Sequence, residues 1–261
     1  MSEQRTILRF QKGHFSTSPD LIAPEEPMEI RIEGRSIAVL MRTPGHDIEL
    51  SIGFLRTEGV IEDGMDIHAI DHIVDPLSPQ KNTIDTVLSS GVPAKRKHLA
   101  DRNLFASSSC GVCGKASLDK IFLIAPPLPQ HRSISPALIC SLPKRLKEQQ
   151  LLFEQTGGLH AAALFNLSGE IVVIREDIGR HNAVDKVIGH CIKQDIDMSS
   201  LILLVSGRVG FDIAQKALMA QLPILAAIGA PSSLAVDFCS SAKITLFGFV
   251  NGLRFNQYTG F

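Results

Sequence analysis

The sequence predicts an α/β protein in which helices cover both faces of a mixed sheet, with a smaller β-rich subdomain at the N-terminus. From residue 136 onward, apolar runs of strand length alternate with helically spaced segments, and repeated strand–helix–strand units build a mostly parallel sheet between helices. The first hundred residues contain short alternating segments and one helical segment instead. Hydrophobic residues make up 44% and charged residues 20% of the 261 positions, which is an ordinary composition for a protein with a buried core.

The β-rich subdomain is expected over residues 1–106. Alternating side chains around Glu33-Gly34 predict two strands joined by a turn at this dipeptide. Gly59 ends the helical segment that follows. The expected elements, in order, are two strands within 28–41, a helix over 47–59 and a further mixed stretch over 66–88.

A long loop follows this subdomain. Residues 89–117 are rich in Ser, Gly, Lys and Arg and have no sustained period. Loops of this length are functional or disordered more often than inert. We therefore expect 107–134 to be a flexible linker, which carries the sequence Cys110-Gly111-Val112-Cys113.

The α/β domain is expected over residues 135–261. Its first helix starts with Ser135 as the N-cap and Pro136 in the first turn, and it ends before Thr156-Gly157-Gly158. The predicted strands are 159–166, 170–175, 201–206, 223–229 and 244–250, and the predicted helices are 136–155, 181–194, 211–221 and 232–242. In such a sheet the loops at the carboxyl ends of the strands form the binding edge.

Charge and chain patterning exclude several classes of protein. Lys and Arg number 26 and Asp and Glu 27, so a net charge of −1 removes the electrostatic argument for a general nucleic-acid or membrane-surface binder. The N-terminus lacks a signal-peptide pattern, and no run of about 18 apolar residues could span a membrane. We expect a cytoplasmic protein, and the odd cysteine count fits a reducing compartment. The five cysteines are Cys110, Cys113, Cys140, Cys191 and Cys239, and the last three are expected to be buried small apolar residues.

The pair Cys110 and Cys113 is the segment with the richest chemistry. Thiols at this spacing act as nucleophile and resolver, or supply half of a zinc site. Zinc would need two more ligands at short spacing, for which only isolated His98 or His160 is available, so no metal site is predicted. Incidental cysteines on a solvated basic loop are the other alternative. The surrounding basic residues, which would favour a thiolate or a persulfide, are Lys95, Arg96, Lys97, Arg102, Lys115 and Lys120.

Polar residues also cluster where a predicted strand meets a predicted helix, over Arg175–Asn182. Backbone N–H groups at the start of a helix favour anions, so Arg180 and His181 are candidate ligand contacts. The alternative is that Asp177 only caps the helix and His181 only packs. One turn further, Asp185-Lys186 could equally belong to a solvated helix face.

A second turn of this kind follows the buried strand LILLV. Ser206 and Gly207 form a small turn in which the backbone can approach a phosphate, and Arg208 can bind it with two donors. Together with Thr156–Gly158 and Gly229–Ser233, these turns predict one extended edge for a nucleotide-like ligand. The GxxxxGK[ST] pattern of an ATP-hydrolysing loop is absent from the sequence.

Five segments of the chain together resemble the FdhD family of formate dehydrogenase accessory sulfurtransferases. They are SSSCGVCGKAS at 107–117, TGGLHAAALF at 156–165, REDIGRHNAVDKVIG at 175–189, SGRVGFDIAQKA at 206–217 and APSSLAVDF at 230–238. The resemblance extends from about residue 28 to the C-terminus, with the segments in family order. It implies a cytidine-deaminase-like α/β fold and a homodimer.

The resemblance also implies a function. Family members take sulfur from a cysteine desulfurase as a persulfide and pass it to the molybdenum bis(molybdopterin guanine dinucleotide) cofactor before its insertion into the formate dehydrogenase apoenzyme. On this chain, Cys110 matches the persulfide-bearing cysteine and Cys113 its neighbour. Residues expected to bind the cofactor are Phe249, Val250, Asn251, Gly252, Leu253, Arg254, Arg180, His181, Ser206, Gly207 and Arg208.

The chain departs from the family pattern at a few positions. Asp212 replaces the usual Glu and Ser232 the usual Thr, and both changes keep the functional group. The segment 250–253 is less basic than expected.

Two other functions compete with sulfur transfer. A zinc-dependent deaminase needs H-x-E and P-C-x-x-C, but His160-Ala161-Ala162 lacks the Glu and Ser206-Gly207-Arg208 lacks the cysteines. A non-covalent cofactor-binding chaperone would carry a structural or redox CxxC. The chaperone predicts that Cys110→Ala leaves function intact, whereas the sulfurtransferase predicts its loss.

Overall fold

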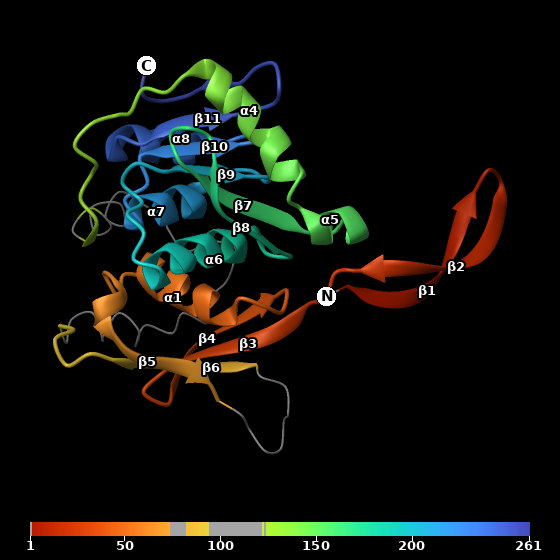
Figure 1. The fold of residues 1–261 in the computed structure, drawn as a ribbon, viewed down its shortest axis with the longest axis horizontal. Helices are drawn as coiled ribbons and strands as arrows, with labels where there is room; N and C mark the ends of the chain where they lie inside the picture. The colour runs from red at the N-terminus through yellow and green to blue at the C-terminus, as the bar shows by residue number, and fades with distance from the viewer. Residues whose placement is uncertain (1, 74–81, 94–121, 123) are drawn as a thin grey trace.

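The computed structural model describes residues 2–73, 82–93, 122 and 124–261. These residues form three parts: a projecting N-terminal hairpin, a four-stranded sheet with one helix, and a six-stranded sheet with helices on both faces (Figure 1). The linker that carries Cys110 and Cys113 lies outside the described residues. Within the part of the chain that the structure describes, no helix is long and apolar enough to cross a membrane.

The hairpin consists of β1 (Glu3–Gln11) and β2 (His14–Ile22), which pair only with each other. Its turn, Lys12-Gly13, has positive φ at both residues (52° and 83°), which matches the right-handed twist of the flanking strands. In Figure 1 the hairpin extends away from the body of the molecule. The sequence analysis assigned no strands to residues 3–22, so this element was missed.

The four-stranded sheet has the strand order β4-β3-β6-β5. Its strands are β3 (Glu26–Ile32), β4 (Arg35–Arg42), β5 (Ile67–His72) and β6 (Thr83–Leu88). The predicted turn at Glu33-Gly34 joins β3 to β4, again with positive φ at both positions. Helix α1 (Asp47–Thr57) follows the predicted bounds closely and covers one face, and a short 3-10 turn, η1 (Gly64–Asp66), follows it.

The six-stranded sheet has the strand order β12-β11-β10-β9-β7-β8. Its strands are β7 (His160–Phe165), β8 (Ile171–Asp177), β9 (Ile202–Val205), β10 (Ile224–Ala227), β11 (Thr245–Gly248) and β12 (Asn256–Gln257). Only β9, β10 and β11 pair in parallel, so the expectation of a mostly parallel sheet was wrong while that of a mixed sheet is confirmed. The cause is the tight turn at Ser168-Gly169, because a hairpin forces β7 and β8 to run antiparallel.

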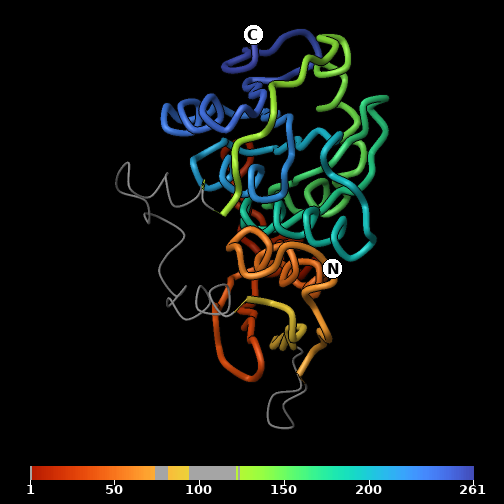
Figure 2. The backbone as a smooth tube through the Cα atoms, turned by 90° about the vertical axis from the view of Figure 1, so that its left-hand side faces the viewer, coloured from red at the N-terminus to blue at the C-terminus, as the bar shows by residue number. Residues whose placement is uncertain are grey.

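Helices cover both faces of this sheet, as predicted (Figure 2). On one face lie α6 (Arg180–Lys193), α7 (Phe211–Met219) and α8 (Ser233–Ala242), and on the other lies α4 (Pro136–Lys147). Successive residues of a strand point to opposite faces of the sheet and so belong to different cores. Leu203 and Leu225 pack in the core under α6, α7 and α8, whereas Leu204 and Ile224 pack in the core under α4.

The predicted helix 136–155 is two helices, α4 and α5 (Leu151–Thr156). Ser135 and Pro136 occupy the predicted first positions of α4. The break follows from a tertiary contact: the Glu176 carboxylate on β8 accepts hydrogen bonds from the backbone N–H groups of Leu152 and Phe153, at 3.0 and 2.8 Å. This partner fixes a new helix start that local spacing does not reveal.

Candidate functional site

The loops at the carboxyl ends of the parallel strands β9, β10 and β11 lie side by side. Backbone hydrogen bonds tie them together: Gly229 donates to the Gly207 carbonyl at 3.2 Å, and Phe249 donates to the Gly229 carbonyl at 3.0 Å. A Cβ atom on Gly229 would lie 2.7 Å from the Gly207 carbonyl oxygen. Glycine is therefore required here for the loops to approach one another, and the turns at Ser206-Gly207 and Gly229 lie next to each other, as the predicted edge requires.

Ser206 fixes the first of these loops to the neighbouring strand. Its backbone N–H donates to the Ala161 carbonyl, and its hydroxyl accepts from the Ala161 N–H at 2.9 Å. Because the hydroxyl is already engaged, Ser206 shapes the loop, and Arg208 is the exposed side chain that it presents.

Three side chains gather next to this loop: Arg180 and His181 from the start of α6, and His160 from the start of β7. A Cβ atom on Gly207 would lie 3.3 Å from Nδ1 of His160 and 3.7 Å from Cδ of Arg180. The Nε2 atom of His181 lies 3.7 Å from Oδ2 of Asp212, at the start of α7. The structure thus brings together Arg180, His181 and Gly207, which the sequence analysis had placed on separate turns.

Both imidazoles are held in the neutral form. Burial, together with the charges of Arg180 and Lys216, lowers the pKa of His181 to about 4. Burial, followed by Arg180, also lowers the pKa of His160. The neutral imidazoles beside Arg180 indicate a positive potential at this edge, which a negative ligand would reduce.

The helices that start at this edge add to the positive potential. Neither Gly179, the N-cap of α6, nor Gly210, the N-cap of α7, supplies a side-chain cap to the first-turn N–H groups. Among the described residues, the side chains of Arg180 and Arg208 form no hydrogen bond or ion pair. Two helix starts without a side-chain cap and two arginines without a partner among the described residues favour an anionic ligand such as a phosphate, while Asp212 in the first turn of α7 opposes one.

The expected cofactor segment, 249–254, leaves the carboxyl end of β11. Phe249 has a positive φ of 53°, a strained conformation for an aromatic residue, and its side chain is 46% exposed. Asn251 closes the turn, because its side-chain oxygen accepts from the N–H groups of Leu253 and Arg254. Gly252, Leu253 and Arg254 are exposed.

Val250 is the member of this segment that faces inward. Its side chain is 1% exposed and packs in the core under α4, and its N–H donates to the Ala227 carbonyl. Neither its side chain nor its N–H is available to a ligand. The structure therefore gives Val250 a packing position between two residues that are open to solvent.

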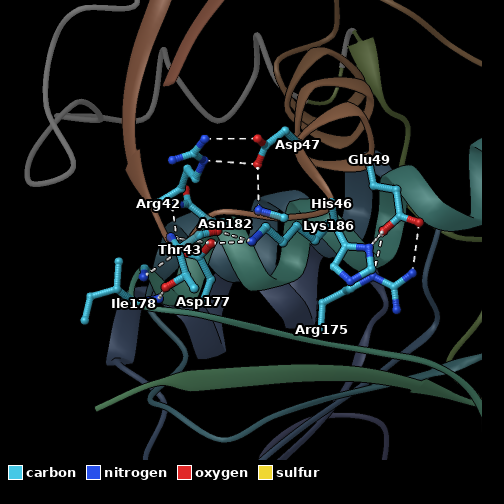
Figure 3. Close-up of polar contacts among 12 residues, drawn as sticks. Arg42, Thr43, His46, Asp47, Glu49, Arg175, Asp177, Ile178, Asn182 and Lys186 are labelled. Carbon is cyan, nitrogen blue, oxygen red and sulfur yellow. Dashed lines mark hydrogen bonds and ion pairs between the residues drawn. The ribbon is translucent and has the colours of Figure 1, made fainter. Parts of the chain in front are cut away.

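The stretch Arg175–Asn182 contains residues that hold the fold together as well as Arg180 and His181 at the edge. Asp177 is fully buried, and its carboxylate accepts from the N–H groups of Thr43 and Gly179 and lies 2.6 Å from Nζ of Lys186 (Figure 3). The same carboxylate accepts from Asn182. These residues join the six-stranded sheet to the loop before α1, so they hold the fold together.

Asp185 and Lys186 are not a solvated helix face, and that alternative was wrong. Their side chains are 2% and 1% exposed. Asp185 accepts from Lys216 and from the Thr57 hydroxyl of α1, both at 2.9 Å. Burial of α6 against α1 explains the difference, because this contact could not be read from the spacing of α6 alone.

A cavity of about 250 Å³ opens on this seam. Arg175 and Lys186 line it, but Arg175 is bound to Glu49 at 2.6 Å and Lys186 to Asp177. Both cations are neutralised by carboxylates, so the cavity carries less net positive potential than the edge near Arg180.

The remaining cysteines follow the prediction in two of three cases. Cys191 and Cys239 are buried and Cys140 is half-buried. Burial raises the pKa of both Cys191 and Cys239 to about 12, so these thiols stay protonated and unreactive near neutral pH.

His160, Lys216 and Asp212 are site residues that the sequence analysis did not assign to the edge. The sequence analysis had considered His160 as an isolated zinc ligand and as the histidine of an incomplete deaminase motif. The one signal for its position was its place before the apolar strand AAALF, next to Gly157-Gly158. Lys216 and Asp212 lie on α7, whose first turn faces the start of α6.

Comparison with known proteins finds relatives that match this chain over nearly its whole length. The model of the FdhD/NarQ family matches residues 23–261. The sulfur carrier protein FdhD of Streptomyces coelicolor is 44% identical over 270 residues, which cover 100% of this chain and 94% of that protein. The protein of the same name from Sulfolobus acidocaldarius is 43% identical over 254 residues, with 97% and 94% covered.

A solved structure supports the fold. The crystal structure described as that of a formate dehydrogenase accessory protein from Desulfotalea psychrophila matches with a TM-score of 0.77 at 24% identity, over 99% of this chain and 96% of that chain. At this identity the likeness concerns the fold. The family match and the full-length relatives establish the identity of the chain: it belongs to the FdhD/NarQ family.

Proposed function

We propose that this protein is a sulfurtransferase that accepts sulfur from a cysteine desulfurase as a persulfide on Cys110. It then transfers this sulfur to the molybdenum bis(molybdopterin guanine dinucleotide) cofactor before the cofactor enters the formate dehydrogenase apoenzyme. The observation that carries the proposal is the end-to-end similarity to proteins named sulfur carriers, in a chain that retains Cys110-Gly111-Val112-Cys113.

The first step is a thiol exchange. The Cys110 thiolate attacks the outer sulfur of the desulfurase persulfide, the S–S bond of the donor breaks, and the donor cysteine leaves as a thiolate. No net oxidation occurs, because one S–S bond forms as one breaks. The basic residues near Cys110 in the sequence would favour the thiolate that this attack requires.

The second step delivers the outer sulfur to the cargo. The S–S bond on Cys110 breaks, Cys110 leaves as a thiolate, and the sulfur becomes a ligand of the metal. Conversion of this sulfur to sulfide takes two electrons, which a reduced metal centre in the cargo would provide. Cys113 lies close enough in sequence to relay or protect the sulfur.

The carboxyl edge of the six-stranded sheet has groups suited to the nucleotide arms of this cargo. Pyrophosphate needs cationic donors and free N–H groups, which Arg180, Arg208 and the starts of α6 and α7 provide. The exposed ring of Phe249 offers a surface for a guanine base. We propose that Asn251, Gly252, Leu253 and Arg254 complete this contact, and that the protein works as a cytoplasmic homodimer.

The test combines mass spectrometry with transfer. The purified protein is incubated with a cysteine desulfurase and ³⁴S-cysteine, and peptides are analysed with and without reductant. In the wild-type protein we expect one labelled sulfur on Cys110 that reductant removes. The Cys110→Ala variant should carry no such label and should fail to activate formate dehydrogenase. Cys191 and Cys239 are internal controls that should remain unlabelled.

Two outcomes would contradict the proposal. Activation that survives Cys110→Ala would favour a non-covalent cofactor chaperone. Unmodified thiols with stoichiometric zinc would make the cysteine pair half of a metal site. The Cys113→Ala variant tests whether Cys113 relays the sulfur. If it does, the variant should still load sulfur on Cys110 but should not transfer it to the cofactor.

A further inference from the structure

The cluster around His181 suggests more than a static anion site, and the argument rests on the proposed nucleotide edge. His181 Nε2 has less than 1 Å² of accessible surface and no hydrogen-bond partner among the described residues. The side chain as a whole is still 21% exposed, so its ring reaches the edge. An unpartnered polar atom at this position is costly unless a ligand or a proton satisfies it.

We propose that the pocket formed by Arg180, His181 and His160 around Gly207 binds the pyrophosphate of the cargo with uptake of a proton by His181. The incoming phosphate oxygens would take the space over the Gly207 backbone, where a side chain would meet both His160 and Arg180. The proton comes from solvent and converts the His181 imidazole to an imidazolium, whose positive charge then attracts the phosphate. No bond is broken in this step.

The charges facing His181 explain why the proton is absent before the ligand arrives. Arg180 lies beside it on α6, Lys216 and Asp212 face it from α7, and His160 faces it from β7. Asp185 neutralises much of Lys216, through a contact of 2.8 Å, and Asp212 is 58% exposed. Arg180 is therefore the main uncompensated charge, and with burial it disfavours a second positive charge on the ring.

A bound phosphate reverses this balance. Its negative charge neutralises Arg180 and adds an attractive partner at contact distance, so the pKa of His181 rises from about 4 toward neutrality. Burial and Arg180 also lower the pKa of His160, against the effect of Asp177, so a bound phosphate raises the pKa of His160 as well. Binding and protonation are then linked, and each favours the other.

The sign of the pH dependence follows. Between the pKa of free His181 and its higher pKa in the complex, the complex holds more protons, so affinity rises as pH falls, by at most about tenfold per pH unit for one proton. Cargo would bind more tightly at lower pH and be released by deprotonation of His181.

Calorimetry with inorganic pyrophosphate, and with GDP as a second probe, tests the linkage. Titration at pH 6 in buffers of different ionisation enthalpy gives the number of protons taken up. Since pyrophosphate itself titrates near pH 6 and can exchange protons on binding, the decisive quantity is the difference between variants. We expect wild type to take up at least about half a proton more than His181→Gln, and His14→Gln, which alters an exposed histidine on the remote hairpin, to behave as wild type.

A second measurement does not depend on any variant. The imidazole signals of the wild-type protein are titrated by NMR with and without pyrophosphate, and we expect the His181 pKa to move up by about two units or more. Binding with equal proton uptake in wild type and His181→Gln, or an unmoved His181 pKa, would overturn the linkage but leave the nucleotide edge intact. Absence of binding by both probes would overturn the linkage and the edge together. Sulfur loading of Cys110 is measured separately, so failure of sulfur transfer is distinguishable from failure of this inference.

Discussion

Gly53 of α1 and Gly189 of α6 meet where the two helices cross, and a Cβ atom on Gly189 would lie 2.8 Å from the backbone nitrogen of Gly53. It would also lie 1.8 Å from the Glu49 carbonyl oxygen, and a Cβ on Gly53 would lie 1.8 Å from the Asp185 carbonyl oxygen. The four-stranded and six-stranded sheets are therefore joined, through α1 and α6, by a backbone-to-backbone contact that only glycine permits. This crossing aligns α6, and so places Arg180 and His181 at the carboxyl edge.

Substitution at this crossing should be strongly destabilising. Gly53→Ala or Gly189→Ala forces the helices apart, because the nearest atoms are backbone and cannot rotate away, and we expect a loss of about 3 kcal/mol or more. Urea unfolding of each variant measures this loss in the free energy of unfolding. Gly91→Ala is the control, since a Cβ there meets nothing within 4 Å, and it should change stability by less than about 1 kcal/mol. Equal effects at Gly91 and Gly53 would contradict the close-packing argument.

The ion pair of Lys186 and Asp177 is the second element of this seam. Lys186→Met leaves a fully buried carboxylate without its cation, and we expect a loss of about 3 kcal/mol. Lys144→Met is the matched control, because Lys144 is 82% exposed and pairs with Glu148 at 3.9 Å; its loss should be below about 1 kcal/mol. Chemical denaturation of both variants decides the point, and similar losses would mean that burial of Lys186 matters little.

The N-terminal hairpin should be dispensable for folding. The three apolar cores of the described residues contain no residue of β1 or β2. One face of the hairpin carries Leu8, Phe10, Phe15 and Leu21, all exposed. We expect a chain that starts at Ala23 to keep its thermal midpoint within about 3 °C and to self-associate less, as measured by calorimetry and light scattering. A collapse of the thermal midpoint would show that the hairpin supports the body.

The sequence was sufficient for elements defined by local signals. The buried run LILLV, the turn at Ser168-Gly169 and the cap at Ser135-Pro136 each fix an element within a few residues. Two kinds of error had tertiary causes. The Glu176 carboxylate starts α5 from another strand, and the hairpin at 3–22 buries no face, so its strands lack the apolar signature that marks β7 or β9.

The site was predictable as one edge made of several turns, but the side chains that meet within it were not. Arg180, His181 and Arg208 were found because glycine and charge follow apolar runs. His160 was not, because its neighbours at the edge, Arg180 and Gly207, lie 20 and 47 residues away and only the antiparallel pairing of β7 brings them together. Cys110 and Cys113, the proposed persulfide pair, lie outside the described residues, so their role is a prediction from the sequence alone.

His181 should make the folded protein sensitive to acid. Above pH 6.5 the ring is neutral in both the folded and the unfolded states, and stability is unaffected by it. As pH falls from 6.5 to about 4, the unfolded chain takes up a proton that the folded chain refuses, because burial and Arg180 hold the pKa of His181 at about 4. This difference should cost about 2 kcal/mol by pH 4.5.

Urea unfolding at pH 7 and pH 4.5 measures that cost, with His181→Gln as the variant that cannot titrate. We expect the stability advantage of wild type over His181→Gln to shrink by about 2 kcal/mol between the two pH values, while wild type and His14→Gln lose stability in parallel. If His181→Gln and wild type also lose stability in parallel, His181 is not held neutral by the fold. The positive field assigned to Arg180 would then have to be revised, because that field is what keeps the proton away until a negative ligand arrives.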